Sequence, residues 1–243
     1  MDKQKNVLIT GASRGIGRAI ATRLTHDGYR VINLDKLAPP SLLKDEEFHQ
    51  IDITHSDVLK ALLQEITART KVLRLVNNAG IIKPGALEDV SVEDFDAVYA
   101  LNLKAPMVLT QQLVPQMREA NFGRIVNIAS RAALGKEERT AYAAMKAGLQ
   151  GMTRTWALEL AQFGITVNAI GPGPIATELF TSGNPPNAPK TIKIIENVPV
   201  KRMGQPEDIA HTAAYLLDDR SSFTTGQTLF VCGGITVGLS NAS

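Results

Sequence analysis

The sequence predicts an α/β fold, a doubly wound parallel sheet with helices on both faces. Two observations predict it. Apolar runs of strand length alternate with stretches of helical periodicity, the order expected of strand–helix–strand units. The runs are also almost continuously apolar, as in Val-Leu-Ile at 7–9 and Ile-Val-Asn-Ile at 125–128. Strands of this kind are covered on both faces.

The expected strands share a length of five or six residues, and they lie at 6–10, 30–34, 72–76, 124–129, 165–170 and 228–232. Helical periodicity is clearest at 16–26, 56–68 and 141–162. Gly28 and Gly164 follow the first and the last of these helices, where a left-handed residue commonly ends a helix.

We expect one domain over residues 1–243. The Pro-rich stretch 181–190 could be a linker between domains, but too little chain follows it to form a second one. We interpret it as a mobile surface loop over a site, because long loops in compact domains tend to be functional. It lies within an expected substrate loop at 178–200.

Composition excludes several classes of protein. An apolar fraction of 44% and a charged fraction of 21% exclude intrinsic disorder. A net charge of +2, with basic residues scattered along the chain, predicts no nucleic-acid partner. No apolar run approaches the about 18 residues of a membrane span, and residues 1–6 do not resemble a signal peptide. The single cysteine, Cys232, precludes an internal disulfide and a thiolate metal site. We expect a cytoplasmic protein with no metal and no membrane partner.

A glycine-rich turn follows the first expected strand and opens the first helix. Its glycines, at 11, 15 and 17, allow a tight turn and let the main chain approach a phosphate at the helix N-terminus. Asp35 ends the next strand, 18 residues after Gly17, where dinucleotide-binding folds place a carboxylate that accepts hydrogen bonds from ribose hydroxyls. The G-x-x-x-G-x-G spacing alone also fits a purely structural turn.

The same segment matches the nucleophile elbow of serine hydrolases, with Ser13 between Gly11 and Gly15. Its position argues against this alternative. An elbow needs an oxyanion-hole loop from an earlier strand, and only ten residues precede Gly11. His211 could be a distant base, but nothing in the sequence ties it to Ser13.

Tyr142 and Lys146 stand four residues apart in the long helix, so they share a face. The spacing also fits an ordinary polar contact. A phenol titrates near 10, and a nearby ammonium lowers that pKa, which would let Tyr142 exchange a proton near neutral pH.

Four motifs occur in order along the chain: the glycine turn, Asn-Asn-Ala-Gly at 77–80, Ser130 at the end of a strand, and the Tyr142–Lys146 pair. Together they resemble the short-chain dehydrogenase/reductase family, over essentially the whole chain from 10 to 234. The resemblance implies a single Rossmann-type domain, NAD(P)-dependent hydride transfer and a homotetramer. Its subunits would pair through the helix at 141–162 and the region 91–121.

The resemblance also implies the roles of four catalytic residues. Tyr142 exchanges a proton with the reacting oxygen, Ser130 holds the same oxygen, and Lys146 lowers the Tyr142 pKa and reaches the nicotinamide ribose. Asn102 holds a water on a proton relay to the lysine.

The cofactor-binding residues that the resemblance implies come from the loops after the strands. The pair 52–53 would lie near the adenine, Pro172 and Gly173 beside the nicotinamide, and Thr177 against its carboxamide. The full set is Gly11, Ser13, Arg14, Gly15, Ile16, Gly17, Asp35, Asp52, Ile53, Asn78, Ala79, Gly80, Tyr142, Lys146, Pro172, Gly173 and Thr177.

Two departures from the family pattern concern the site. The loop from Ser130 to Tyr142 is one residue shorter than the commonest spacing, and it carries the charged run 136–139 (Lys-Glu-Glu-Arg). We interpret that run as a solvated turn rather than as a wall of the substrate site. Cys232 stands where the family usually has aspartate, and we expect it to be a buried small hydrophobe.

The sequence therefore predicts an NAD(H)-linked oxidoreductase that acts on a secondary alcohol or its ketone, a small molecule. Asp35 should repel a 2′-phosphate, whereas Arg14 and Lys36 could bind one, so NADP is the less favoured cofactor. The alternative within the family is an NADP(H)-dependent 3-oxoacyl-thioester (acyl-ACP) reductase. A non-catalytic dinucleotide-binding regulator is an alternative of another class, although a regulator would not need the proton-relay residues.

Overall fold

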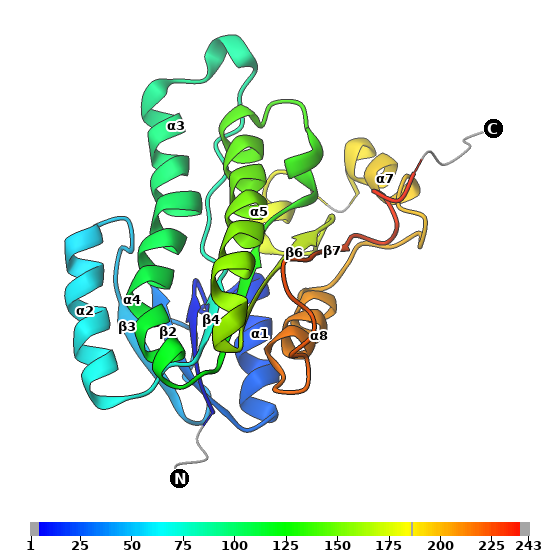
Figure 1. The fold of residues 1–243 in the computed structure, drawn as a ribbon. Coiled ribbons are helices and arrows are strands. Elements are labelled where there is room, and N and C mark those ends of the chain that lie inside the picture. Colours follow the sequence, from blue (N-terminus) through cyan, green and yellow to red (C-terminus); the bar gives the residue numbers. More distant parts are fainter. Residues whose placement is uncertain (1–4, 186, 239–243) are drawn as a thin grey trace.

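A seven-stranded parallel sheet forms the centre of the molecule, with strand order β3-β2-β1-β4-β5-β6-β7 (Figure 1). The computed structural model describes residues 5–185 and 187–238. Residues 1–4, at the start of the chain, and Pro186, in the expected substrate loop, lie outside the described residues. The predicted α/β, doubly wound fold class is confirmed.

All six expected strands form, with ends that shift by one or two residues. Their bounds are Lys5–Thr10 (β1), Tyr29–Asp35 (β2), Arg74–Asn77 (β4), Gly123–Ile128 (β5), Ile165–Pro172 (β6) and Thr228–Val231 (β7). The seventh strand, β3 (Glu46–Gln50), was not predicted, because Glu-Glu-Phe-His-Gln shows neither an apolar run nor an alternation. It forms as an edge strand, paired with β2 from Val31–Glu46 to Asp35–Gln50.

The three expected helices also form, and others join them. The helix bounds are Gly15–His26 (α1), Ser56–Arg69 (α2), Val92–Tyr99 (α3), Ala105–Glu119 (α4), Thr140–Leu160 (α5), Glu178–Thr181 (α6), Pro189–Glu196 (α7) and Pro206–Leu217 (α8). A π-helical segment, η2 (Ala100–Lys104), joins α3 to α4, so that the three run on as one column (Figure 1). Gly28 and Gly164 both have positive φ, as predicted for residues that end helices.

The segment 178–200 is not the continuous loop that the sequence predicted. It contains α6 and α7, and local chemistry explains both. The hydroxyl of Thr177 caps α6 by accepting a hydrogen bond from the main-chain N–H of Phe180. Pro189 occupies the first turn of α7, where its missing N–H costs nothing.

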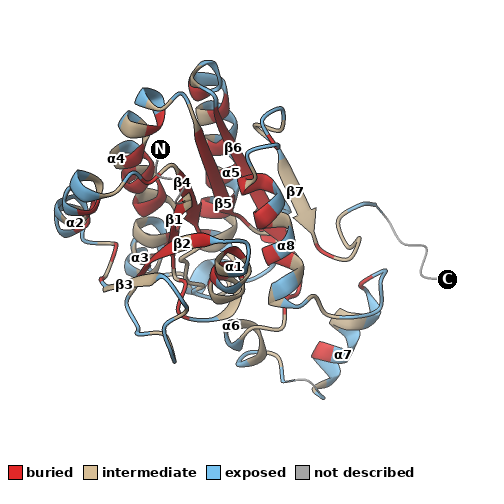
Figure 2. Ribbon diagram, turned by 90° about the horizontal axis from the view of Figure 1, so that it is seen from below, coloured by how far each residue is buried: buried red, intermediate tan, exposed pale blue. Residues whose placement is uncertain are grey.

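Helices cover both faces of the sheet. Along β1, Leu8 packs in one core layer with α2, α4 and α5, whereas Val7 and Ile9 pack in the opposite layer with α1 and α8. This follows from the alternation of side chains along a strand. In Figure 2 the buried residues concentrate on the central strands and on the helix faces turned toward them. No helix in the described part of the chain is long and apolar enough to cross a membrane.

The order of the strands decides where a site can form. The chain leaves β1 toward β2 and β3 on one side, then returns to β4 and proceeds toward β7 on the other. The loops after β1 and β4 therefore diverge at this switch point. A crevice at the carboxyl ends of the strands is the usual ligand site in such sheets.

Candidate active site

The glycine turn between β1 and α1 has the shape that a dinucleotide needs. Gly11 and Gly15 adopt φ values of +67° and +54°, in the left-handed region that favours glycine. A Cβ atom at Gly17 would lie 2.1 Å from the main-chain oxygen of Gly11, so no larger residue fits there. No side chain caps the N-terminus of α1, and its first turn holds no acidic residue. The turn therefore fits the pyrophosphate of a dinucleotide, which the free N–H groups would bind.

Two side chains from β2 support this turn. The amide oxygen of Asn33 accepts a hydrogen bond from the main-chain N–H of Ala12 at 3.2 Å, and its amide nitrogen donates to the hydroxyl of Ser13 at 3.2 Å. The carboxylate of Asp35 accepts from the N–H groups of Ser13, at 3.0 Å, and Leu37, at 3.1 Å. Ser13 is buried, so its hydroxyl is not exposed as the nucleophile of a hydrolase elbow would be.

Asn33 and the residue behind it, Glu46, were not predicted from the sequence as parts of the site. Asn33 lies inside the otherwise apolar run 31–34. A polar side chain within a strand expected to be buried was the sequence feature that could have indicated a role for it. Its amide nitrogen also donates to Glu46 at 3.0 Å, and the Arg18 guanidinium donates to both carboxylate oxygens of Glu46 at 2.8 Å. The Glu46 side chain is fully buried. The unpredicted strand β3 thus supplies the charge that orients Asn33.

The Asn-Asn-Ala-Gly motif joins β4 to the glycine turn across the switch point. The amide nitrogen of Asn78 donates to the main-chain oxygens of Thr10, at 2.9 Å, and Gly11, at 3.0 Å. In return, the Thr10 hydroxyl accepts from the N–H groups of Asn78 and Ala79, both at 3.0 Å. These four bonds set the distance between the two diverging loops.

Asn102 lies in the π-helical segment η2, fully buried. Its amide oxygen accepts from the N–H of Ile81 at 2.9 Å, and its amide nitrogen donates to the carbonyl of Ile81 at 2.9 Å. A Cβ atom at Gly80 would lie 3.2 Å from the amide oxygen of Asn102 and 3.5 Å from the Lys146 ammonium. Gly80 therefore lies close to both Asn102 and Lys146.

The Ser130 hydroxyl lies close enough to the Tyr142 phenol to interact with it. Ser130 follows β5 and caps a short 3₁₀-helix, η3 (Arg131–Leu134), by accepting from the N–H of Ala132 at 3.1 Å. Tyr142 comes from the first turn of α5. Its surroundings withdraw the phenol from water and raise its pKa above the ordinary 10, while the Ser130 hydroxyl and the charge of Arg139 oppose this rise.

Lys146 lies one helical turn beyond Tyr142 and is buried, with 3% of its surface exposed. Its ammonium donates to the main-chain oxygen of Ile128 at 2.6 Å and lies 5.6 Å from the centre of the Tyr142 ring. Burial lowers the pKa of Lys146 to about 8. The expected lowering of the Tyr142 pKa by Lys146 is wrong for this structure, because loss of water around the phenol outweighs the charges near it.

Asp52 and Ile53, which are expected near the adenine, are held by local contacts. The carboxylate of Asp52 accepts from the N–H and hydroxyl of Thr54, at 3.0 and 2.6 Å, and pairs with Lys36 at 3.0 Å. These contacts lower the pKa of Asp52 to about 2. The side chain of Ile53 is buried in the core layer of α2.

The residues expected beside the nicotinamide come from the end of β6 and the chain after it. A Cβ atom at Gly173 would lie 2.6 Å from Cα of Cys232, so only glycine fits between β6 and β7 there. A Cβ atom at Gly15 would lie 3.5 Å from the Thr177 methyl group, which places Thr177 over the glycine turn. Pro172, Gly173 and Thr177 therefore lie at the same edge of the sheet as the glycine turn.

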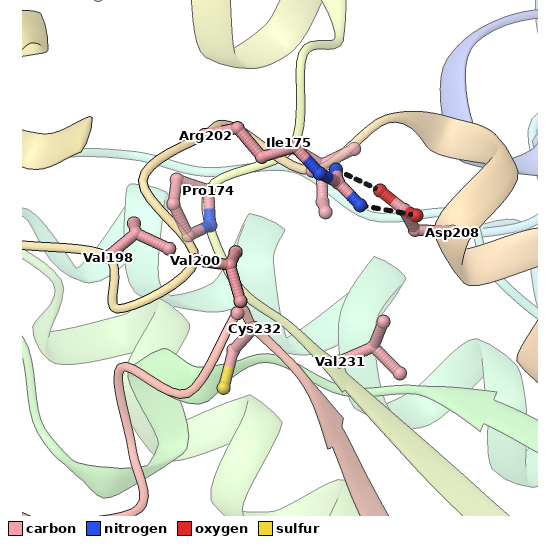
Figure 3. Close-up of a pocket in the computed structure, with 10 residues that line it drawn as sticks. Pro174, Ile175, Val198, Val200, Arg202, Asp208, Val231 and Cys232 are labelled. Carbon is pink, nitrogen blue, oxygen red and sulfur yellow. Dashed lines mark hydrogen bonds and ion pairs between the residues drawn. The ribbon is translucent and has the colours of Figure 1, made fainter.

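A pocket of about 190 Å³ lies beside this edge (Figure 3). The chain after β6, the chain after α7 and the end of β7 line it with mainly apolar side chains. Figure 3 shows the ion pair between Arg202 and Asp208, with an N–O distance of 2.8 Å, at one end. The lining residues are Pro174, Ile175, Val198, Val200, Arg202, Gly204, Asp208, Val231, Cys232 and Gly233. None of the four candidate catalytic residues is among them, so this pocket is not the reaction site.

The structure shows where Cys232 and the charged run 136–139, the two departures from the family pattern, lie. Cys232 is buried, as predicted, and its sulfur lies 3.2 Å from the hydroxyl of Thr236. The run 136–138 is exposed, as a solvated turn should be, and Arg139 is half-buried. Among residues 5–185 and 187–238, no group of three or more His, Cys, Asp or Glu side chains is placed to hold a metal ion.

Comparison with known proteins identifies the family. The family model described as enoyl-(acyl carrier protein) reductase matches residues 11–236. A hydroxy(phenyl)methylsuccinyl-CoA dehydrogenase subunit, BbsD, of Thauera aromatica is 39% identical in an alignment of 237 positions that covers 93% of this chain and 94% of that protein. The chain belongs to the short-chain dehydrogenase/reductase family.

Other members of the short-chain dehydrogenase/reductase family also resemble the chain over nearly its whole length. The 3-oxoacyl-(acyl-carrier-protein) reductase of Staphylococcus epidermidis is 37% identical over 95% of this chain and 98% of its own length. The solved structure of Thermoplasma acidophilum aldohexose dehydrogenase superimposes with a TM-score of 0.91 at 31% identity, covering 99% of this chain and 97% of the other. Similar solved structures include complexes with NADH and with NADP. The protein is an NAD(P)-dependent oxidoreductase of the short-chain family.

Proposed function

We propose that this protein transfers a hydride between NAD(H) and a secondary alcohol or its ketone, with Tyr142 as the acid and base. The observation that carries the proposal is the convergence of Ser130, Tyr142 and Lys146. The Ser130 hydroxyl lies beside the Tyr142 phenol and acts to lower its pKa, and the buried Lys146 ammonium lies 5.6 Å from the centre of the Tyr142 ring. A phenol with a second hydroxyl beside it fits the oxygen of a carbonyl or an alcohol.

When bound, the nicotinamide would supply the hydride in reduction or accept it in oxidation. In reduction, the carbonyl carbon receives the hydride and its oxygen receives the Tyr142 hydroxyl proton, which leaves Tyr142 as a phenolate. Ser130 would donate a hydrogen bond to the same oxygen and stabilise the charge that develops there. Because the Tyr142 pKa is raised, Tyr142 is protonated at neutral pH and ready to act as the proton donor.

Lys146 would restore the proton of Tyr142. With a pKa of about 8, it is mostly protonated at pH 7 and close enough to neutrality to release a proton. Asn102 lies beside Gly80 and would hold a water that passes protons to Lys146. The bond from Lys146 to Ile128 keeps the ammonium on this path.

Asp35 supports NAD(H) rather than NADP(H) as the cofactor. Its carboxylate accepts two main-chain hydrogen bonds and retains lone pairs for the hydroxyls of the adenosine ribose. The basic residues that could bind a 2′-phosphate have acidic partners. Arg14 pairs with Glu178 at 3.4 Å, and Lys36 pairs with Asp52. A like-charge contact with Asp35 costs several kcal/mol, more than one exposed arginine contact returns.

A second candidate is an NADP(H)-dependent 3-oxoacyl-thioester reductase. The 37% identity to 3-oxoacyl-(acyl-carrier-protein) reductases supports it, as do the NADP complexes among similar structures. A non-catalytic regulator is less well supported, because a regulator needs the glycine turn but not an assembled group of Asn102, Ser130, Tyr142 and Lys146.

We further propose that residues 1–243 act as one catalytic domain, that 178–200 contacts the substrate, and that the enzyme works in the cytoplasm as a homotetramer. Two features support the assembly. The outer face of α5 carries small exposed residues, Ala147 and Gly151 among them, and Leu158 on this helix is 83% exposed. Such a face permits close approach of a second helix.

A cofactor-oxidation assay tests the proposal. NADH and NADPH are each supplied with a panel of ketones that includes sugars, oxo acids, steroids and 3-oxoacyl thioesters. We expect turnover with NADH and at least one ketone. Turnover with NADPH and 3-oxoacyl thioesters alone would favour the second candidate, and no turnover with any pair would favour the regulator.

A further inference from the structure

A buried carboxylate, that of Glu46, lies on the same face of the sheet as Asn33. Strand β3 lies beside β2 at the edge of the sheet (Figure 2), with Glu46 opposite Val31. Because side chains alternate along a strand, positions 31 and 33 of β2 share the face that α1 covers, and Glu46 reaches the same face from β3. Glu46 and Asn33 are therefore diagonal neighbours across the two strands, behind the glycine turn.

The Glu46 carboxylate accepts hydrogen bonds from three sides. The Arg18 guanidinium donates to both of its oxygens at 2.8 Å, and the main-chain N–H of Leu43 donates to one of them at 2.7 Å. The Asn33 amide nitrogen donates to the other oxygen at 3.0 Å. The Glu46 side chain is fully buried and paired with a guanidinium, and a carboxylate has acceptors only. Asn33 must therefore present its nitrogen, and not its oxygen, to Glu46.

This contact fixes which way the Asn33 amide points. An asparagine amide has donors on its nitrogen and acceptors on its oxygen, and a half-turn about its last bond exchanges the two. With the nitrogen toward Glu46, the oxygen accepts from the N–H of Ala12 at 3.2 Å, and the nitrogen also donates to the Ser13 hydroxyl at 3.2 Å. The opposite orientation would turn an oxygen toward the Glu46 carboxylate and a donor toward the Ala12 N–H, so both contacts would be repulsive.

The orientation of Asn33 matters for the cofactor, because Asn33 and Asp35 hold the strand side of the glycine turn. Their side chains accept from the N–H groups of Ala12 and Ser13. The N–H groups in the first turn of α1 have no side-chain cap and would bind the pyrophosphate. Asn33 and Asp35 thus determine where these uncapped N–H groups lie.

The turn leaves little room for adjustment. A Cβ atom at Gly17 would lie 2.1 Å from the main-chain oxygen of Gly11, so the strand side of the turn lies directly against α1. A shift of Ala12 would therefore displace the start of α1. We infer that Glu46 is a positioning residue for the dinucleotide: by fixing the Asn33 amide, it fixes the turn that binds the pyrophosphate. The inference rests on the proposed function for its cofactor and is independent of the substrate.

Two neighbouring glutamates of β3 provide the test and its control. Glu46→Gln keeps the size of the side chain but can donate as well as accept, so the Asn33 amide becomes free to turn. Glu47→Gln removes the next carboxylate, which lies on the other face of β3, accepts from Arg30 at 2.7 Å and also pairs with Arg69. Thermal unfolding of both variants measures the loss of stability that breaking an ion pair of this edge strand causes by itself.

Calorimetry with NAD⁺, NADP⁺ and ADP-ribose measures the effect without turnover. All three carry the same pyrophosphate, and ADP-ribose has no nicotinamide. We expect Glu46→Gln to weaken the binding of each at least about tenfold and by the same factor, with Glu47→Gln within about twofold of the wild type. In kinetics, KM for the cofactor should rise while kcat stays within about twofold, because Ser130, Tyr142 and Lys146 are not displaced. Unchanged binding in Glu46→Gln, equal losses in both variants, or no binding of any probe to the wild-type protein would overturn the inference.

A double-mutant cycle separates positioning from stability. Asn33→Ala should weaken the binding of NAD⁺ at least about tenfold, and adding Glu46→Gln to it should change the affinity less than about twofold, since Glu46 acts through Asn33. Losses that multiply would show that Glu46 acts by another route. If Glu46→Gln does not fold, Asn33→Ala decides, and NAD⁺ binding within about twofold of the wild type would contradict the inference. Absence of turnover together with Glu46-dependent binding would instead contradict only the proposed function.

Discussion

The Lys146 ammonium donates a hydrogen bond of 2.6 Å to the main-chain oxygen of Ile128, the last residue of β5. Ser130 lies two residues beyond Ile128, and Tyr142 lies one helical turn before Lys146. This bond therefore ties the strand that leads to Ser130 to the helix that carries Tyr142. It also keeps a charge in a position where burial lowers its pKa to about 8.

Replacing Lys146 with methionine should change how stability depends on pH. Lys146 has a pKa of about 8 when folded and near 10.5 when unfolded. Between these values the unfolded chain binds more protons, so the wild-type free energy of unfolding gains from this group as pH rises from 8 to 10.5. Relative to Lys146→Met, the wild-type protein should gain about 2–3 kcal/mol over that window. Denaturant titrations at pH 7 to 10 measure it, with the exposed Lys60→Met as control. Parallel curves for wild type and Lys146→Met would contradict burial of the charge.

Tyr142→Phe removes only the phenolic oxygen. We expect kcat to fall by at least about 100-fold, because a positioned acid and base is lost. Cofactor affinity should stay within about twofold, since the ring remains. Steady-state kinetics and a cofactor titration measure the two effects. The control is Tyr215→Phe, which removes an exposed phenol of α8 that is hydrogen-bonded to the hydroxyl of Thr224. Turnover within tenfold of the wild type would rule out Tyr142 as the proton donor.

The Asp35 carboxylate should make the enzyme prefer NADH over NADPH by at least tenfold in kcat/KM, through repulsion of the 2′-phosphate. Asp35→Ala should erode or reverse this preference. The variant also loses the acceptor for the N–H groups of Ser13 and Leu37, so Asp35→Asn, which keeps an oxygen acceptor, separates charge from support of the turn. Kinetics with both cofactors measure the ratio. A wild-type preference for NADPH would show the Asp35 argument to be wrong and would favour the 3-oxoacyl-thioester reductase.

Gly151→Arg tests the proposed homotetramer. A Cβ atom at Gly151 meets nothing within 4 Å in the same chain, so the arginine fits the folded protomer. In a tetramer paired through α5 it would separate the helices, and light scattering should give a smaller mass than the wild type gives. Gly151→Ala is the control, which should keep the wild-type mass and slightly stabilise the helix. A monomer mass for the wild-type protein at micromolar concentration would refute the assembly.

Local patterns in the sequence determined the parts of this protein in which neighbouring residues decide the structure. Continuous apolar runs marked β1, β2, β5 and β6, because a strand covered on both faces consists mostly of apolar residues. The glycines of the turn and the four-residue spacing of Tyr142 and Lys146 were likewise readable, since a positive φ or a shared helix face depends on nearby positions alone. The order of the motifs also predicted the family.

Only the tertiary structure decided which distant groups meet. The edge strand β3 had no apolar pattern, so its Glu46 could not be placed behind Asn33 from the sequence. Arg14 pairs with Glu178, which lies 164 residues away in the chain. The direction of the Tyr142 pKa shift was decided in the same way, because it depends on how much water the surrounding chain removes from the phenol. Desolvation and long-range pairing are properties of positions in space, and local sequence patterns do not record them.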